Sequence, residues 1–108
     1  MLSKELRLNV SDFKAKKPLQ QRRNAYFLLK VFSSEEENPR FGVVVSKKVH
    51  ALASSRNKLR RRIFDFFREN LGKIAKGRDY LLIVSPSASK LEENSAIVRH
   101  LENLFFGP

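Results

Sequence analysis

Residues 47–62, with the sequence KKVHALASSRNKLRRR, form a basic block that lies between two apolar segments. The block carries seven Lys or Arg side chains and no Asp or Glu. The preceding residues Phe41–Val45 are apolar in succession, which is typical of a strand covered on both faces. In the following segment, apolar residues recur at the spacing of one helix face, at Leu59, Ile63, Phe66 and Phe67. The strand and the helix must therefore pack together while the block between them stays at the surface.

The helix is expected to begin within the basic block, with the hydroxyl of Ser54 or Ser55 as its N-cap. At about 100° per residue, the block divides into two sectors of this helix. Beside the apolar stripe lie Arg56, Asn57, Arg60 and Arg61, and behind them lie Lys58 and Arg62. Cations are disfavoured at a helix N-terminus unless an anion meets them, and guanidinium groups suit phosphate oxygens. A solvated helix face is the alternative, but the uniform sign of the charge favours a phosphate-binding surface.

The composition of the 108-residue chain indicates one folded domain, residues 1–108, that binds a polyanion. The net charge of +11 points to nucleic acid first and to an anionic membrane surface second. Nucleic acid is favoured because the apolar helix stripe is needed for the core. The absence of Cys excludes disulfides and thiolate metal sites. No apolar run approaches the ~20 residues of a membrane span and the N-terminus lacks a signal-peptide core, so a cytoplasmic location is expected.

The remaining patterns predict a two-layer α+β sandwich in the order helix, strands, helix, strand, helix. Helices are expected at residues 10–16, from the basic block to Asn70 or Leu71 with Gly72 as the stop, and at 90–105. Strands are expected at residues 19–24 on an edge, 25–32, 41–46 in the centre and 79–84. The acidic loop at residues 33–39 would repel a polyanion, so it is expected on the side away from the phosphate-binding surface.

Residues 25–32 alternate, so that one set of side chains faces the main core and the other faces the first helix. The second set, Tyr26, Leu28 and Lys30, is expected to line a cleft together with Phe13 of that helix. Phe13 has two interpretations. As a lone aromatic residue on a helix it is a core side chain, whereas in a cleft its ring is a stacking surface for an unpaired base.

The sequence offers no complete catalytic set. His50 and His100 are the only histidines, and apart from Glu35–Glu37 the acidic residues are scattered at spacings that do not form a metal site. Gly-rich phosphate loops, Ser-His-Asp sets and zinc patterns do not occur. The chain is therefore expected not to catalyse hydrolysis unaided.

The sequence RNKLRR at residues 56–61, preceded by GVVVSKKV at residues 42–49, resembles the signature of the protein subunit of bacterial ribonuclease P. The similarity extends from about Arg7 to the last helix. The resemblance implies the fold shared by the second domain of a small-ribosomal-subunit protein and by domain four of the translocation elongation factor. In that fold the strand-helix-strand crossover is left-handed, against the usual rule.

In that family the catalyst is RNA, which removes the 5′ leader of precursor tRNA with the help of Mg²⁺. The resemblance thus implies an endoribonuclease subunit with no catalytic residue, no bound cofactor and no metal of its own, because Mg²⁺ acts through the RNA. It implies catalytic RNA and precursor tRNA as partners, and neither a membrane nor a protein partner is indicated. The implied RNA-facing residues are Lys47, Lys48, Arg56, Asn57, Lys58, Arg60 and Arg61. The implied 5′-leader cleft comprises Phe13, Tyr26, Leu28 and Lys30.

Four positions depart from the family pattern. Lys58 stands where Arg is usual, and Phe64 stands where another basic residue is common. Lys17 stands where an apolar residue often follows Phe13, and Lys30 replaces a frequent Tyr. Two other classes stay open: a ribosomal-type RNA-binding protein or RNA chaperone of the same fold, and a DNA-binding module with the helix at 56–70 in a major groove. DNA is disfavoured because Asn57 is the one obvious base-reading side chain at the helix start.

Overall fold

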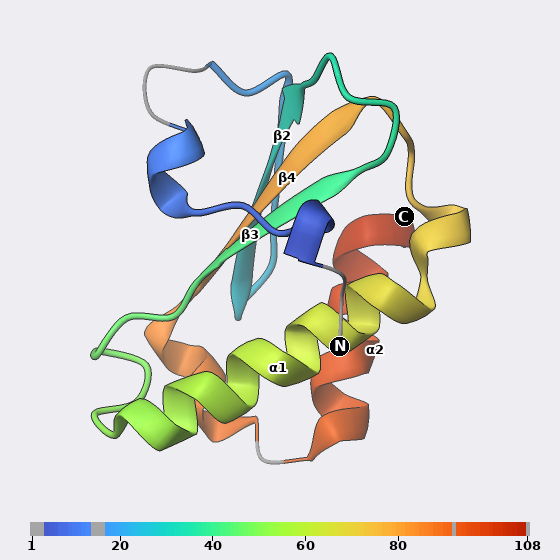
Figure 1. Cartoon of the computed structure of the whole chain (residues 1–108). Coiled ribbons are helices and arrows are strands. Elements are labelled where there is room, and N and C mark those ends of the chain that lie inside the picture. Colours follow the sequence, from blue (N-terminus) through green and yellow to red (C-terminus); the bar gives the residue numbers. More distant parts are fainter. Residues whose placement is uncertain (1–3, 14–16, 92, 108) are drawn as a thin grey trace.

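The computed structural model describes residues 4–13, 17–91 and 93–107, without the side chains of residues 10 and 11. It confirms the predicted two-layer α+β arrangement, in which two helices lie together on one side of a four-stranded sheet (Figure 1). The strands are β1 (Gln20–Arg23), β2 (Phe27–Ser33), β3 (Arg40–Val44) and β4 (Arg78–Val84). The helices are α1 (Ala53–Glu69) and α2 (Asn94–Phe106). Short 3-10 helices occupy Lys4–Leu6, Val10–Phe13, Leu71–Lys73 and Pro86–Lys90.

The strands are ordered β1-β2-β4-β3, so β3 lies at an edge and its predicted central position is wrong. Strand β3 pairs parallel with β4, which makes α1 the crossover between them, while the other pairs are antiparallel. The run of consecutive apolar residues in β3 has another cause. Phe41 and Val43 pack in the core under the helices, whereas Gly42 and Val44 meet residues on the opposite face of the sheet. The edge strand is therefore covered on both faces.

The N-terminal segment wraps around the exposed edge of β3. Arg7 forms a parallel bridge with Phe41, and the amide of Leu8 donates a hydrogen bond of 2.6 Å to the Phe41 carbonyl. Leu6 packs against the core on the helix side, while Leu8 packs on the opposite side. This segment thus protects a strand edge whose backbone groups would otherwise be open to another chain.

The main core lies between the sheet and the helices. The predicted stripe of α1 is buried at all four positions, Leu59, Ile63, Phe66 and Phe67. The ring of Phe67 stacks on that of Phe41 with the centroids 4.2 Å apart, which fixes α1 over β3. A smaller cluster on the other face of the sheet contains Phe13, Phe32 and Leu81. The sheet therefore has one large helix-covered face and one sparsely covered face.

Helix α1 begins and ends at residues other than those expected. Its N-cap is Leu52, whose apolar side chain cannot accept a hydrogen bond, so the prediction of Ser54 or Ser55 as the cap is wrong. At the other end, the side-chain amide of Asn70 donates a hydrogen bond of 2.8 Å to the Phe66 carbonyl. The helix therefore ends at Glu69, one residue before the earlier of the two predicted ends, and Gly72 is not its stop because it belongs to the following 3-10 helix.

The first and last predicted helices also differ from the structure. The first is a 3-10 helix at Val10–Phe13, and residues 14–16 of the prediction lie outside the described residues. The last begins at Asn94 because the segment Pro86–Lys90, with proline at its first position, forms a separate 3-10 helix. At its C-terminus, the guanidinium of Arg22 donates hydrogen bonds to the carbonyls of Phe105 and Gly107, where a cation is favoured.

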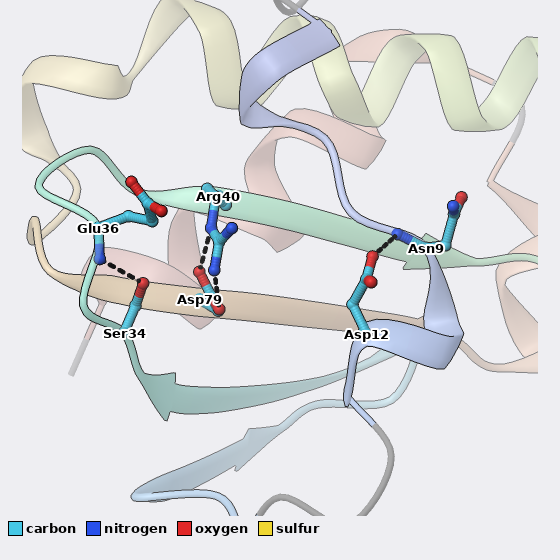
Figure 2. A network of polar contacts seen from close by, with 6 residues as sticks. All are labelled: Asn9, Asp12, Ser34, Glu36, Arg40 and Asp79. Carbon is cyan, nitrogen blue, oxygen red and sulfur yellow. Dashed lines mark hydrogen bonds and ion pairs between the residues drawn. The ribbon is translucent and has the colours of Figure 1, made fainter.

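The acidic loop joins β2 to β3 and lies at the opposite end of β3 from the start of α1 (Figure 1), as expected. Beside this loop, Arg40 of β3 makes a bidentate ion pair with Asp79 of β4, with both donor-acceptor distances 2.9 Å (Figure 2). Asp79 is fully buried. Its hydrogen bonds hold the pKa of Arg40 above the usual value. This guanidinium therefore joins the first residue of β3 to the second residue of the parallel strand β4.

Candidate nucleic-acid interface

A groove with cationic walls runs between α1 and the N-terminal segment. It consists of two hollows of about 440 and 540 Å³ that share Arg7, Arg60 and Phe64. The first is also lined by Ser54, Asn57 and Arg61, and the second by Lys4, Leu8, Asn9 and Val43. Among the residues that the structure describes, no Asp or Glu lines either hollow. We call these two hollows the basic groove.

Two cations of the basic groove, Lys4 and Arg7, were missed at the level of sequence. The first nine residues mix polar and apolar side chains, and their position depends on pairing with β3, which is remote in the sequence. Strand alternation gives no signal for this placement, because Leu6 and Leu8 are two residues apart yet pack on opposite sides of the sheet. The backbone contacts of Arg7 and Leu8 with Phe41 place Arg7 opposite Arg60 of α1.

The α1 wall of the groove presents Asn57, Arg60 and Arg61, three of the four residues that the helical spacing placed in one sector, whereas the fourth, Arg56, does not line it. The guanidinium of Arg60 donates a hydrogen bond of 2.7 Å to the side-chain oxygen of Asn57, one turn earlier. This contact orients two polar groups toward the same hollow. Arg61 is exposed beside them. The wall thus offers several donors to an anion without a competing carboxylate among its lining residues.

Arg56 has a structural contact that sequence reasoning did not anticipate. Its guanidinium donates hydrogen bonds to the carbonyls of His50 and Ala51, at 3.0 and 2.9 Å. These bonds tie the first turn of α1 to the loop before it, at the helix end whose cap residue is apolar. Lys47 and Lys48 are exposed in the turn that follows β3.

Lys58 lies on the other flank of α1, as the predicted sectors require. It shares a hollow of about 280 Å³ with Arg62 and His50, and the hollow is completed by Ser55, Leu59, Ser89, Leu91 and Ile97. The seven residues predicted to face RNA are therefore not one patch. Asn57, Arg60 and Arg61 share a hollow, while Lys58 is on the far flank and Lys47 and Lys48 lie in the preceding turn.

The sparsely covered face of the sheet holds three of the four residues predicted for the leader cleft. Phe13 is only 6% exposed, and its ring centroid lies 5.1 Å from that of Phe32. Its Cε2 atom lies 2.7 Å from where a Cβ at Gly42 would stand, so the ring fits because residue 42 is glycine. Phe13 is therefore a core side chain here. Leu28 and Lys30 are half-buried beside it on the same face.

The fourth residue, Tyr26, does not lie in that cleft, and this placement was wrong. The side-chain oxygen of Asn24 accepts hydrogen bonds from the amides of Tyr26 and Phe27, both at 2.9 Å. This turn delays the start of β2 to Phe27 and takes Tyr26 out of the strand alternation. The ring of Tyr26 instead lies 4.5 Å from that of His100 in α2, in the helix layer.

Within the described parts of the chain, no three His, Asp or Glu side chains gather into a group suited to a metal ion. None of the helices described there is long and apolar enough to cross a membrane.

The fold and the basic groove together define a small α+β domain of the polyanion-binding class. Comparison with known proteins then gives the family. The sequence model of the Ribonuclease P family matches residues 2–107. The chain therefore belongs to the ribonuclease P protein family.

Individual relatives agree with this assignment. The ribonuclease P protein component of Pseudanabaena sp. (strain PCC 6903) is 39% identical over 69 residues, which are 63% of this chain and 60% of that protein, so the match spans less than two thirds of the relative. The RNase P protein from Thermotoga maritima has a similar structure, with a TM-score of 0.72 and 33% identity over 86% of this chain and 84% of that one. For Staphylococcus aureus RNase P protein the TM-score is 0.80, with 26% identity over 92% and 91% of the two chains.

Proposed function

We propose that this chain is the protein subunit of a ribonuclease P, which binds a catalytic RNA and assists the removal of the 5′ leader from precursor tRNA. The observation that carries the proposal is the basic groove in a member of this family. Cations from two separate segments line it, and no carboxylate stands among its described lining residues. Such a surface is suited to the closely spaced phosphates of a folded RNA.

In this proposal the protein acts through charge and position. Each Lys or Arg that contacts a phosphate releases condensed counterions and reduces repulsion between RNA segments. The complex then needs less Mg²⁺ to assemble. The Mg²⁺ ions are bound by the RNA, which carries out the hydrolysis, while the protein holds no cofactor and supplies no catalytic side chain.

The leader would lie on the sparsely covered face of the sheet. Leu28 and Lys30 of β2 offer an apolar surface and a cation there, next to the partly buried Ile83 of β4. The buried ring of Phe13 has little area left for a base. Phe13 therefore supports this surface from the end of the N-terminal segment instead of stacking on the leader. Binding of the leader is therefore mainly electrostatic and largely independent of base identity.

Cleavage of precursor tRNA at low Mg²⁺ tests this function. The purified protein alone should leave precursor tRNA intact, and it should raise cleavage at the mature 5′ end when a bacterial ribonuclease P RNA is added. Metal-dependent cleavage at that position by the RNA-free protein would contradict the proposed role. Copurification with ribosomal RNA instead of ribonuclease P RNA would favour the alternative of a ribosomal-type RNA-binding protein.

A further inference from the structure

We infer that the hollow lined by Arg7, Ser54, Asn57, Arg60, Arg61 and Phe64 is a pocket for one unpaired nucleotide of the bound RNA. This inference rests on the proposed function, because it names what the RNA inserts into the basic groove. We call the hollow the nucleotide pocket.

The shape of the site is the first reason. A phosphate on a duplex surface needs only exposed cations, and Lys47 and Lys48 are of that kind. The nucleotide pocket is instead an open hollow of about 440 Å³, within the ~300–1,000 Å³ typical of small-molecule sites. Its two walls come from different parts of the chain, with Arg7 fixed on the edge of β3 and Arg60 on α1. The space between them is therefore set by the fold.

The chemistry of the lining is the second reason. Guanidinium groups pair with phosphate oxygens, and their planes also stack on unpaired bases. Asn57 accepts a hydrogen bond from Arg60 with its side-chain oxygen, and its amide group offers donors to a base edge. Ser54 adds a hydroxyl that can donate or accept. A nucleotide needs this combination of an anion site, a stacking surface and hydrogen-bonding groups.

Phe64 supplies an apolar floor. Its ring packs edge-on against Phe67 with the centroids 6.0 Å apart, and 7% of the residue remains exposed. This small exposed area cannot stack on a whole base, so the base would rest on it while the guanidinium groups of the walls cover its faces. An apolar group here favours a base over a second phosphate.

Chemical probing of a full-length bacterial ribonuclease P RNA tests the inference. Base-specific reagents should show that the wild-type protein protects one unpaired base. Arg7→Ala should lose that protection at saturating protein and should bind the RNA about tenfold more weakly, which corresponds to one lost stacking contact. The matched control is Arg99→Ala, which removes an equal charge from the exposed surface of α2. It should keep the protection and change the affinity by less than about twofold.

A further variant keeps the outcome clear if Arg7→Ala folds poorly. Arg61→Ala changes an exposed side chain of the same pocket and should also lose the protection. Protection that is identical in wild type, Arg7→Ala and Arg61→Ala would overturn the nucleotide pocket. Failure of the wild-type protein to bind the RNA at all would instead overturn the proposed function.

Discussion

The basic groove and the sparsely covered face of the sheet both contain arginine and an aromatic ring, but they use them differently. On the sheet face, Arg40 is paired with the fully buried Asp79, and Phe13 is packed against Phe32. In the groove, the described lining includes several cations and no carboxylate. The first region therefore uses its polar and aromatic groups to hold the fold together, whereas the second gathers charge of one sign around a hollow.

The energetic contrast follows from burial. Removing one partner of a buried ion pair leaves an uncompensated charge, whereas an exposed cation contributes about 0–1 kcal/mol to stability. Truncating a buried aromatic ring removes its packing and opens a cavity. Substitutions of the buried Phe13 and Asp79 on the sheet face should thus lower stability, and substitutions of the groove cations should lower RNA affinity without unfolding the protein.

The largest effect is expected for Phe13→Ala, which should lower the free energy of unfolding by about 3–5 kcal/mol. The ring is almost fully buried and fills the space above Gly42. Urea denaturation followed by circular dichroism measures the change. A variant with wild-type stability that loses affinity only for precursor tRNA with a leader would show that Phe13 is a stacking surface instead.

Asp79→Ala should be the next most damaging, by about 3 kcal/mol, because it leaves Arg40 without its bidentate partner. The side chain of Arg40 is 26% exposed, which keeps the loss at the lower end of the usual range. Pairing the change with Arg40→Met in a double-mutant cycle isolates the interaction. If the two single losses simply add, the pair contributes nothing specific to the junction of β3 and β4.

Lys30→Ala should have a smaller effect, confined to the leader. Affinity of the holoenzyme for precursor tRNA with a leader should fall about two- to threefold, as expected for one partly screened cation. Binding of mature tRNA should stay unchanged, and so should the melting temperature. Equal losses on both tRNA forms would remove Lys30 from the leader-binding surface.

Local sequence patterns predicted the elements in which one regularly spaced set of side chains faces the core. The stripe of α1 and the alternation of Phe27, Leu29 and Val31 were both confirmed by burial. These predictions succeeded because helix and strand periodicity directly report which side chains are covered. The uniform charge of the block likewise indicated the α1 wall of the groove, because side chains of one sign on one sector of a helix must share a surface.

Other features depend on contacts that are remote in sequence or on a single side chain. The side-chain oxygen of Asn24 decides where β2 begins, and with it the face of Tyr26. The edge position of β3 could not be predicted, because the N-terminal segment covers the face that a neighbouring layer usually covers. The same pairing of the N-terminal segment with β3 places Arg7 in the groove. The sequence also left two interpretations of Phe13, and the burial of its ring favours the core interpretation.

The central claim is that cations of the basic groove bind RNA without supporting the fold. Arg61 tests it most directly, because its side chain is exposed and lines the groove. The affinity for ribonuclease P RNA should be measured as a function of salt for the wild type, Arg61→Ala and the control Arg99→Ala. We predict that Arg61→Ala reduces the slope of log affinity against log salt by about 0.7–0.9, with stability within about 0.5 kcal/mol of wild type. An unchanged slope and wild-type affinity for Arg61→Ala would contradict the claim.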